Sequence, residues 1–166
     1  MMLSACNTQA ESSPAPSAPV VDKADILPEG AEMQLNAKLT GIWRDTRTAI
    51  VVATVPTLEG KSIDQAAYDM YNSWGIGDRR TNRGLLILVA PTERKVRIEV
   101  GCGMESIITN PVAKKVIDQE MIPGFRRDDA PGAINAGVDA LAAEIAHGRD
   151  TGPVSPACTA MMKKAA

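Results

Sequence analysis

The sequence predicts a three-layer α/β/α sandwich with a small mixed central sheet, and three features support this prediction. Apolar runs of strand length alternate with stretches of helical periodicity along most of the chain. Residues 85–90 (LLILVA) are apolar at every position, which is typical of a strand covered on both faces. Residues 95–100 (KVRIEV) alternate charged and apolar side chains after a turn at 91–94, which predicts a half-exposed strand antiparallel to its predecessor.

The first half of the chain is expected to contribute a helix, a strand and a second helix. Apolar residues at helical spacing from Leu35 to Trp43 form a single stripe, which predicts the first helix. Residues 49–55 are rich in β-branched side chains and are followed by a proline, so a buried strand is expected there. Ser62 and Gln65 have the spacing of a capping box, in which the serine accepts a hydrogen bond from the helix start and the glutamine reaches back. The second helix is therefore expected to begin at this box.

Two more helices complete the predicted architecture. Asn110 and Pro111 are typical of a helix N-cap and of the first helical position, and apolar residues follow them at helical spacing. The last helix is expected to open at residues 129–131 (DAP) and to continue through Ile145. The predicted order is α-β-α-β-β-α-α, with a sheet of at least three strands.

Composition excludes several classes of protein. The 166 residues allow one domain with a core and loose ends, and the net charge of −2 argues against nucleic-acid binding. No apolar run approaches the roughly 20 residues that cross a bilayer. His147 is the only histidine and falls at an expected helix end, so it is read as a solvated side chain rather than as the base of a Ser-His-Asp or Cys-His system. Common nucleotide-binding, zinc-protease and hydrolase motifs do not occur in the sequence.

The chain is expected to have three parts. Residues 1–19 are interpreted as a truncated lipoprotein signal and a disordered tether, 20–148 as the domain, and 149–166 as a flexible tail broken by glycine and proline. Cys6 follows a lipobox-like Leu-Ser-Ala, which predicts lipidation and a periplasmic domain anchored to the bacterial envelope. Asn7, rather than aspartate, after the cysteine favours the outer membrane over the inner. The alternative is an accidental match in a disordered terminus.

Loop acids and an amide predict a metal site. Asp22, Asp78, Asn82, Glu105 and Asp129 lie at the ends of predicted elements, where open α/β sheets place their ligands. Carboxylate and amide oxygens on glycine-rich loops, without histidine, favour Ca²⁺, with Mg²⁺ as the alternative. Each of these residues also has a structural interpretation, such as a helix cap, a turn or a surface ion pair. The metal prediction therefore rests on the set rather than on any single acid.

Six ordered segments resemble the TPM domain family. The resemblance covers about residues 20–147 and implies an α/β sandwich placed outside the cytoplasm. The segments are 21–22 (VD), 26–27 (IL), 74–78 (WGIGD), 82–87 (NRGLLI), 97–105 (RIEVGCGME) and 122–126 (IPGFR).

The resemblance suggests functions without defining one. The family includes thylakoid-lumen proteins involved in photosystem II repair and many bacterial envelope proteins. Plant members are described as calcium-binding and as acid phosphatases. We therefore expect an envelope accessory protein that binds a divalent cation and assists the assembly or maintenance of a membrane complex, with a protein partner there. The alternative is a metal-dependent acid phosphatase, so whether the chain is an enzyme stays open.

The remaining cysteines allow two interpretations. With Cys6 used for the lipid, Cys102 and Cys158 form an even pair in an oxidising compartment, which favours a disulfide. Such a bridge would hold the C-terminal tail near the second glycine-rich loop. The alternative is a buried thiol at 102 and a free one at 158.

Overall fold

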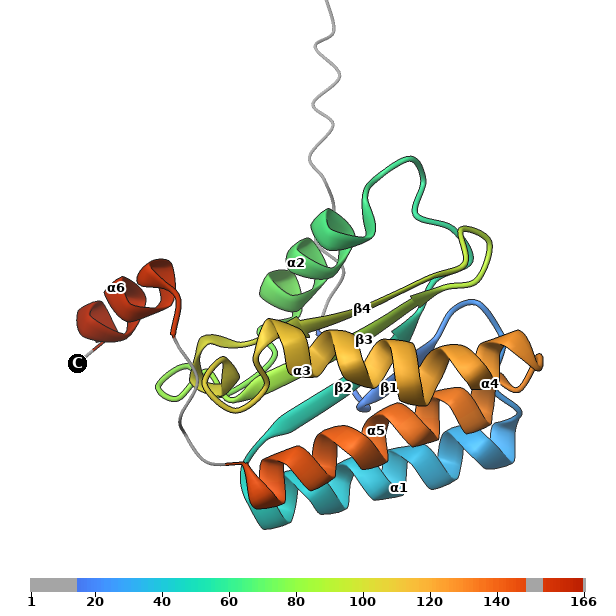
Figure 1. The fold of residues 1–166 in the computed structure, drawn as a ribbon, viewed down its shortest axis with the longest axis horizontal. Coiled ribbons are helices and arrows are strands. Elements are labelled where there is room, and N and C mark those ends of the chain that lie inside the picture. The colour runs from blue at the N-terminus through green and yellow to red at the C-terminus, as the bar shows by residue number, and fades with distance from the viewer. Residues whose placement is uncertain (1–14, 149–153, 166) are drawn as a thin grey trace, which may run out of the picture.

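A four-stranded mixed sheet lies between two layers of helices (Figure 1). The structure is a computed structural model that describes residues 15–148 and 154–165. The sheet has the order β1-β2-β3-β4, in which the first three strands are parallel and β4 runs antiparallel to β3. This arrangement confirms the predicted three-layer α/β class. The strands are β1 (Val20–Asp22), β2 (Ala49–Thr54), β3 (Gly84–Ala90) and β4 (Lys95–Val100).

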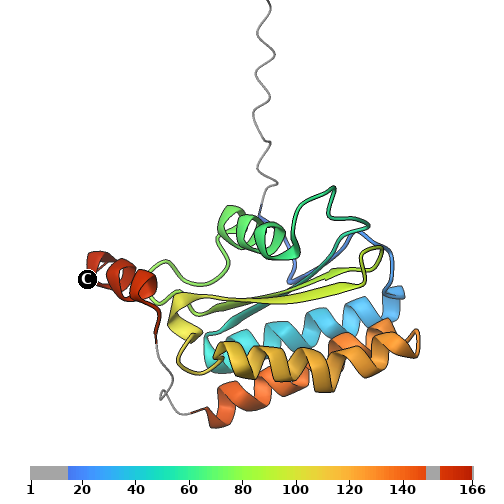
Figure 2. The same ribbon diagram turned by 45° about the horizontal axis from the view of Figure 1, so that its top comes forward.

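The helices are divided unequally between the two faces. One face is covered by α2 alone, whereas α1, α5 and the rod formed by α3, η2 and α4 cover the other (Figure 1, Figure 2). No helix in the described residues is long and apolar enough to cross a membrane. The helices are α1 (Glu29–Thr46), α2 (Ile63–Trp74), η1 (Cys102–Met104, a 3₁₀ turn), α3 (Asn110–Lys115), η2 (Val116–Met121, a π-helix), α4 (Ile122–Arg126), α5 (Ala130–His147) and α6 (Pro156–Ala165).

The central strand β3 supplies both hydrophobic cores. All of its residues are buried, and successive side chains point to opposite faces of the sheet. Leu85, Ile87 and Val89 pack in the core beneath α1 and α5, while Leu86 and Leu88 pack in the core beneath α2. The unbroken apolar run in the sequence is thus explained by a helical layer on each side.

The two crossover connections of the parallel strands leave the sheet on opposite sides. The β1–β2 connection contains α1, the β2–β3 connection contains α2, and these helices cover opposite faces. Each connection leads to the next strand in the same direction across the sheet. Because their helices lie on opposite faces, the two crossovers have opposite hands. One of them therefore departs from the usual right-handed crossover. The loops that follow β1 and β2 therefore diverge. Such a divergence at the carboxyl ends of parallel strands is where open α/β sheets form a ligand crevice.

Two elements differ from the sequence prediction. Strand β1 was not predicted, because three residues are too few to display a period. Residues 156–165 form α6 instead of the predicted flexible tail, so that prediction was wrong for this segment. Ser155 caps the helix, since its Oγ accepts a hydrogen bond from Cys158 N at 3.2 Å, and Pro156 occupies the first turn, where proline is tolerated.

One predicted helix cap and one predicted capping box need correction. Thr109, not Asn110, caps α3, because its Oγ1 accepts a hydrogen bond from Val112 N at 3.4 Å. Ser62 caps α2 as predicted, with Gln65 N donating to its Oγ at 3.1 Å. The Gln65 side chain does not complete the box, since its Nε2 donates to Asp69 at 2.7 Å.

We predict opposite effects of alanine at two helical glycines. A Cβ at Gly124 would lie 2.7 Å from Ala133 Cβ and 2.8 Å from its Cα, because α4 and α5 approach closely there. Gly124→Ala should lower the free energy of unfolding by about 1–3 kcal/mol through overpacking. A Cβ at Gly41 meets nothing within 4 Å, so Gly41→Ala should raise it by about 0.5–1 kcal/mol. Urea unfolding curves measure both changes, and a stabilising Gly124→Ala would contradict the helix contact.

Candidate functional site

The five predicted metal ligands do not form one site, because the sheet separates them into two groups. Asp22 aligns with Thr54 and, through it, with Val89, at the carboxyl end of the parallel strands. Asn82 lies just before Gly84, and Gly84, at the other end of β3, is about 17 Å from Val89 at roughly 3.3 Å per residue. The prediction that one ion binds the whole set was therefore wrong.

The other three predicted ligands divide between the same two ends. The connection between α4 and α5, which contains Asp129, lies at the Asp22 end in both ribbon views (Figure 1, Figure 2). The 75–83 loop with Asp78 and the segment after β4 with Glu105 lie at the opposite end, beside α6. The sequence failed here because it identifies acids at the ends of elements but not which end of the sheet each one reaches.

Asp22 joins the ends of the first two strands to the turn before α1. Its Oδ2 accepts a hydrogen bond from Leu27 N at 2.7 Å, and its Oδ1 accepts from Ile26 N at 3.3 Å and from the Thr54 hydroxyl. The buried Thr54 Oγ1 in turn accepts from Ala24 N at 3.0 Å. None of the donors to Asp22 carries a charge, so they orient the carboxylate without neutralising it. It is held where the loops after β1 and β2 diverge.

An open pocket of about 430 Å³ runs along β1 and includes Asp22. Glu32, a partly exposed residue in the first turn of α1, and Lys23 also line this pocket. Because β1 is the edge strand of the sheet, the pocket borders a strand with no neighbour on its outer side within the described residues. The lining residues are Pro16, Ser17, Ala18, Val20, Val21, Asp22, Lys23, Glu32 and Trp74.

Asp129 has the structural role of a helix cap. Its Oδ1 accepts a hydrogen bond from Gly132 N at 2.9 Å at the start of α5. Its carboxylate lies where a Cβ on Gly132 would stand, so only glycine leaves room for this cap. Capping by an aspartate accounts for this residue without an ion.

At the opposite end, the two glycine-rich loops bind each other directly. Gly103 N donates to the Asn82 carbonyl at 3.1 Å, and Tyr71 Oη donates to Asn82 Oδ1 at 3.1 Å. A Cβ on Gly101 would clash with both Tyr71 Oη and the Asn82 carbonyl oxygen. Burial, reinforced by the charge of Glu99, raises the pKa of Tyr71, so its hydroxyl stays protonated as the donor.

Asp78 is exposed and is engaged within its own loop. Its Oδ1 accepts hydrogen bonds from Arg80 N at 2.7 Å and Thr81 N at 3.3 Å. These backbone donors hold the pKa of the Asp78 carboxyl below its usual value. Its carbonyl accepts from Asn82 N at 2.6 Å, which closes the turn. The residue therefore shapes the loop.

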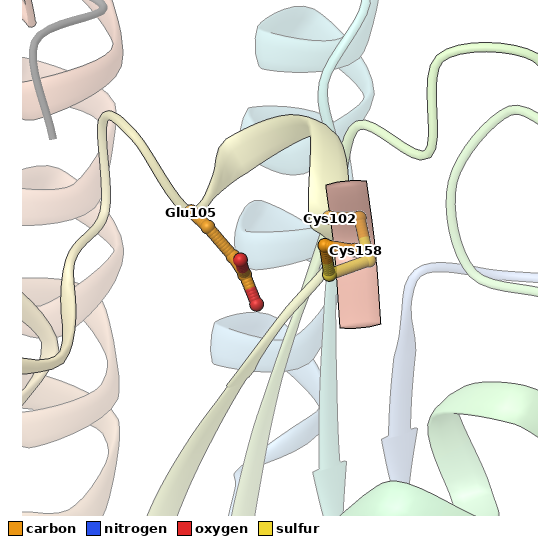
Figure 3. A group of neighbouring side chains, drawn as sticks. All are labelled: Cys102, Glu105 and Cys158. Carbon is orange, nitrogen blue, oxygen red and sulfur yellow. A yellow bond between two sulfur atoms is a disulfide. The ribbon is translucent and has the colours of Figure 1, made fainter. Parts of the chain in front are cut away.

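Glu105 binds the start of α6, beside a disulfide (Figure 3). Its Oε2 accepts a hydrogen bond from Ser155 N at 2.8 Å, and its Oε1 accepts from Ser155 Oγ at 3.3 Å. Cys102 in η1 and Cys158 in α6 form the disulfide, with their Cα atoms 5.2 Å apart. This is the first of the two alternatives left open for these cysteines. The bridge and the Ser155 hydrogen bonds together fix α6 next to η1.

A preformed cluster of carboxylates is not found among the described residues. Within 15–148 and 154–165, one group of three histidine, cysteine or acidic side chains has ligand atoms within 4.8 Å of one another, and it consists of Cys102, Glu105 and Cys158. Its two sulfur atoms are bonded to each other. A Ca²⁺ ion at either end of the sheet would therefore need backbone carbonyls, hydroxyls or water beside one or two carboxylates. The predicted lipidation residue Cys6 lies outside the described residues.

Sequence reasoning missed several residues of this region. Glu32 was not singled out because it lies inside a helix, and Thr54 could not be paired with Asp22 before β1 was known. Trp74 also lines the pocket, and its buried Nε1 has no hydrogen-bond partner in the described part of the chain. Glu93 was also missed; the Thr57 hydroxyl is the main cause that lowers the pKa of its carboxyl. The alignment of Asp22 with Thr54 at the ends of neighbouring strands can be recognised only once the pairing register of β1 and β2 is known.

Comparison with known proteins establishes the family. The sequence matches the TPM domain over residues 20–144, so the chain belongs to the TPM domain family. No similar sequence was found among curated proteins.

Solved structures of three bacterial proteins share the fold. The N-terminal domain of a protein from P. gingivalis is 26% identical, with a TM-score of 0.73 over 78% of this chain and 83% of that one. The N-terminal domain of cg2496 from Corynebacterium glutamicum is 15% identical, with a TM-score of 0.63 over 89% and 90%. BA42 from the psychrophilic bacterium Bizionia argentinensis is 14% identical, with a TM-score of 0.64 over 73% and 82%. Because the proteins from Corynebacterium glutamicum and Bizionia argentinensis are only 15% and 14% identical to this chain, their similarity shows the fold alone.

The loop junction predicts non-additive effects of two substitutions. Gly101→Ala should lower the free energy of unfolding by about 1–3 kcal/mol, because its Cβ meets Tyr71 Oη and the Asn82 carbonyl. Tyr71→Phe alone should cost about 1 kcal/mol through the lost hydrogen bond to Asn82. In the double variant the free energy of unfolding should fall by less than the sum of the two single losses. Phenylalanine lacks the hydroxyl that the new Cβ at position 101 would meet, so one of the two clashes is removed. Urea unfolding of all four proteins measures the coupling, and losses that add within about 0.5 kcal/mol would exclude the proposed clash.

Proposed function

We propose that this TPM-domain chain is a ligand-binding module of the bacterial envelope that binds a divalent cation, with Ca²⁺ as the first candidate. In this proposal the domain lies in the periplasm, is anchored through a lipid on Cys6, and assists the assembly or maintenance of a membrane complex. The observation that carries the proposal is the pocket along β1, which includes the oriented carboxylate of Asp22 and the carboxylate of Glu32.

The chemistry of the pocket suits a calcium ion better than a transition metal. Ca²⁺ accepts six to eight oxygen ligands in flexible geometry, including carboxylates, backbone carbonyls and water. Asp22 and Glu32 supply carboxylates and Ser17 a hydroxyl, and histidine and cysteine are absent from the lining. Two carboxylates do not fill the coordination shell of Ca²⁺. An acidic or carbonyl group of a partner protein could complete it, which would make partner binding calcium-dependent.

The opposite end of the sheet is a weaker candidate for the cation. Glu105 already accepts two hydrogen bonds from Ser155, and Asn82 accepts from Tyr71 and Gly103. A Ca²⁺ ion, which takes six to eight oxygen ligands, would compete there with the hydrogen bonds that hold the loops and α6 together. We therefore assign the cation to the Asp22 end.

A metal-dependent acid phosphatase is the second candidate function. Lys23 lines the same pocket as Asp22, so a phosphate ester could meet a cationic side chain beside a bound ion. The ion would polarise the phosphoryl oxygen and orient water toward phosphorus. Phosphomonoester turnover that disappears on chelation and in Glu32→Gln would favour the enzyme; turnover that survives both changes would indicate contamination.

Calorimetric titration with Ca²⁺ tests the cation proposal. The wild-type chain should bind, and Glu32→Gln should weaken binding at least tenfold, or about 1.4 kcal/mol, because it removes one charged ligand without touching the core. Glu29→Gln, an exposed change in the same helical turn, and Asp78→Asn, at the other end of the sheet, should bind like wild type.

Two outcomes would contradict the proposal. The absence of heat and of a melting shift at millimolar Ca²⁺ and Mg²⁺ would rule out a cation-dependent module. Loss of binding in Asp78→Asn with normal binding in Glu32→Gln would move the site to the opposite end of the sheet.

A further inference from the structure

The side chains around the disulfide form a ligand set whose metal chemistry depends on oxidation state. The sulfur atoms of Cys102 and Cys158 and a carboxylate oxygen of Glu105 lie within 4.8 Å of one another (Figure 3). In the oxidised chain the two sulfur atoms are bonded to each other. Only the reduced chain can supply thiolates, which are the form of cysteine that binds metal ions. We propose that the reduced chain binds Zn²⁺ through Cys102, Cys158 and Glu105, with water as the fourth ligand.

The backbone already places the three ligands for tetrahedral coordination. Cys102 begins η1 and Glu105 follows it, and residues three apart on a 3₁₀ turn lie above one another. Cys158 approaches from the first turn of α6, with its Cα 5.2 Å from that of Cys102. Two Zn–S bonds of about 2.3 Å at a tetrahedral angle need sulfur atoms roughly 3.8 Å apart. Rotation of the cysteine side chains can supply this separation without displacing either backbone.

The surroundings favour a bound metal over a free carboxylate and thiols. Ser155 N donates to Oε2 of Glu105 at 2.8 Å and Ser155 Oγ donates to Oε1 at 3.3 Å, which orients the carboxylate, and each oxygen keeps a further lone pair for a metal. Such outer hydrogen bonds are typical supports of zinc ligands. Cys158 is buried and Cys102 and Glu105 are partly buried, which limits competition from water. The positive end of the α6 dipole favours anionic ligands at this position.

The soft thiolates distinguish this site from the proposed calcium site. Thiolate ligands select zinc over calcium and magnesium, which prefer oxygen. A dithiol reductant transfers two electrons to the disulfide and is itself oxidised to a cyclic disulfide, leaving two thiols on the chain. Zn²⁺ then binds with release of the two thiol protons. The site therefore exists only in the reduced chain.

The proposed site gives α6 two alternative attachments. Among the described elements, α6 makes its main contacts with η1, next to the disulfide. Reduction without metal leaves the Glu105–Ser155 hydrogen bonds as the polar connection between them. Zinc would restore a strong link. Release of α6 would thus require both reduction and removal of zinc.

Zinc titration of the full chain tests this proposal. In a Cys6→Ser background, the two remaining cysteines are the only thiols. The chain is reduced with a phosphine, freed of metal without air, and titrated with Zn²⁺ against a chromophoric chelator. We expect one Zn²⁺ per reduced chain and none per oxidised chain. Co²⁺ in place of Zn²⁺ should produce thiolate-to-metal charge-transfer absorption.

Matched variants separate the three-ligand site from unspecific binding to thiols. Glu105→Gln should weaken zinc binding at least tenfold, whereas Glu120→Gln, an exposed change on η2, should not change it. Cys158→Ser should abolish it, and circular dichroism should show that the domain remains folded. Absence of zinc uptake by the reduced chain at micromolar Zn²⁺ would overturn the proposal. Wild-type affinity in Glu105→Gln would remove the glutamate from the site and overturn it equally.

Discussion

Strand β3 has almost no contact with solvent on either face, and the need to cover both faces determines how the chain is arranged around it. One helical layer buries Leu86 and Leu88, and the other buries Leu85, Ile87 and Val89. The connection after β1 must therefore turn to one side of the sheet and the connection after β2 to the other. The divergence of these two connections is a consequence of this core, and Asp22 is held there by hydrogen bonds from the turn and the neighbouring strand.

The two ends of the sheet differ in what their polar groups already do. At the end opposite Asp22, the loops satisfy each other through Asn82, Tyr71 and Gly103, and α6 is fixed by a disulfide and Glu105. Along the edge strand β1, an open pocket is lined by Asp22, Glu32 and Lys23 among other residues. The contacts at the first end hold loops and a helix together, whereas the pocket lined by Asp22 and Glu32 is open to a ligand. This difference is the reason for assigning the proposed cation to the Asp22 end.

The sequence predicted those parts of the fold whose signals are local. The apolar run of β3, the alternation of β4 and the Asp129 cap of α5 each depend on neighbouring residues, and each was recognised. Strand β1 was not, since three residues become a strand only through pairing with β2. The prediction of a single metal site from the acidic residues was wrong for a related reason. Residue type identifies an acid as a candidate ligand, but the connections between the strands determine at which end of the sheet that acid lies. Cys102 and Cys158 could be paired as an alternative because covalent pairing follows from their number and compartment.

Amide NMR spectra recorded during a Ca²⁺ titration of the full chain test the central claim, that the carboxyl end of the parallel strands is the functional end of this domain. The account predicts concentration-dependent shifts for residues 20–23 and for Glu32, with residues 78–82 and 102–105 unchanged. Shifts confined to 78–82 and 102–105 would place the cation between the glycine-rich loops. That result would contradict the assignment made from the divergence of the two crossovers.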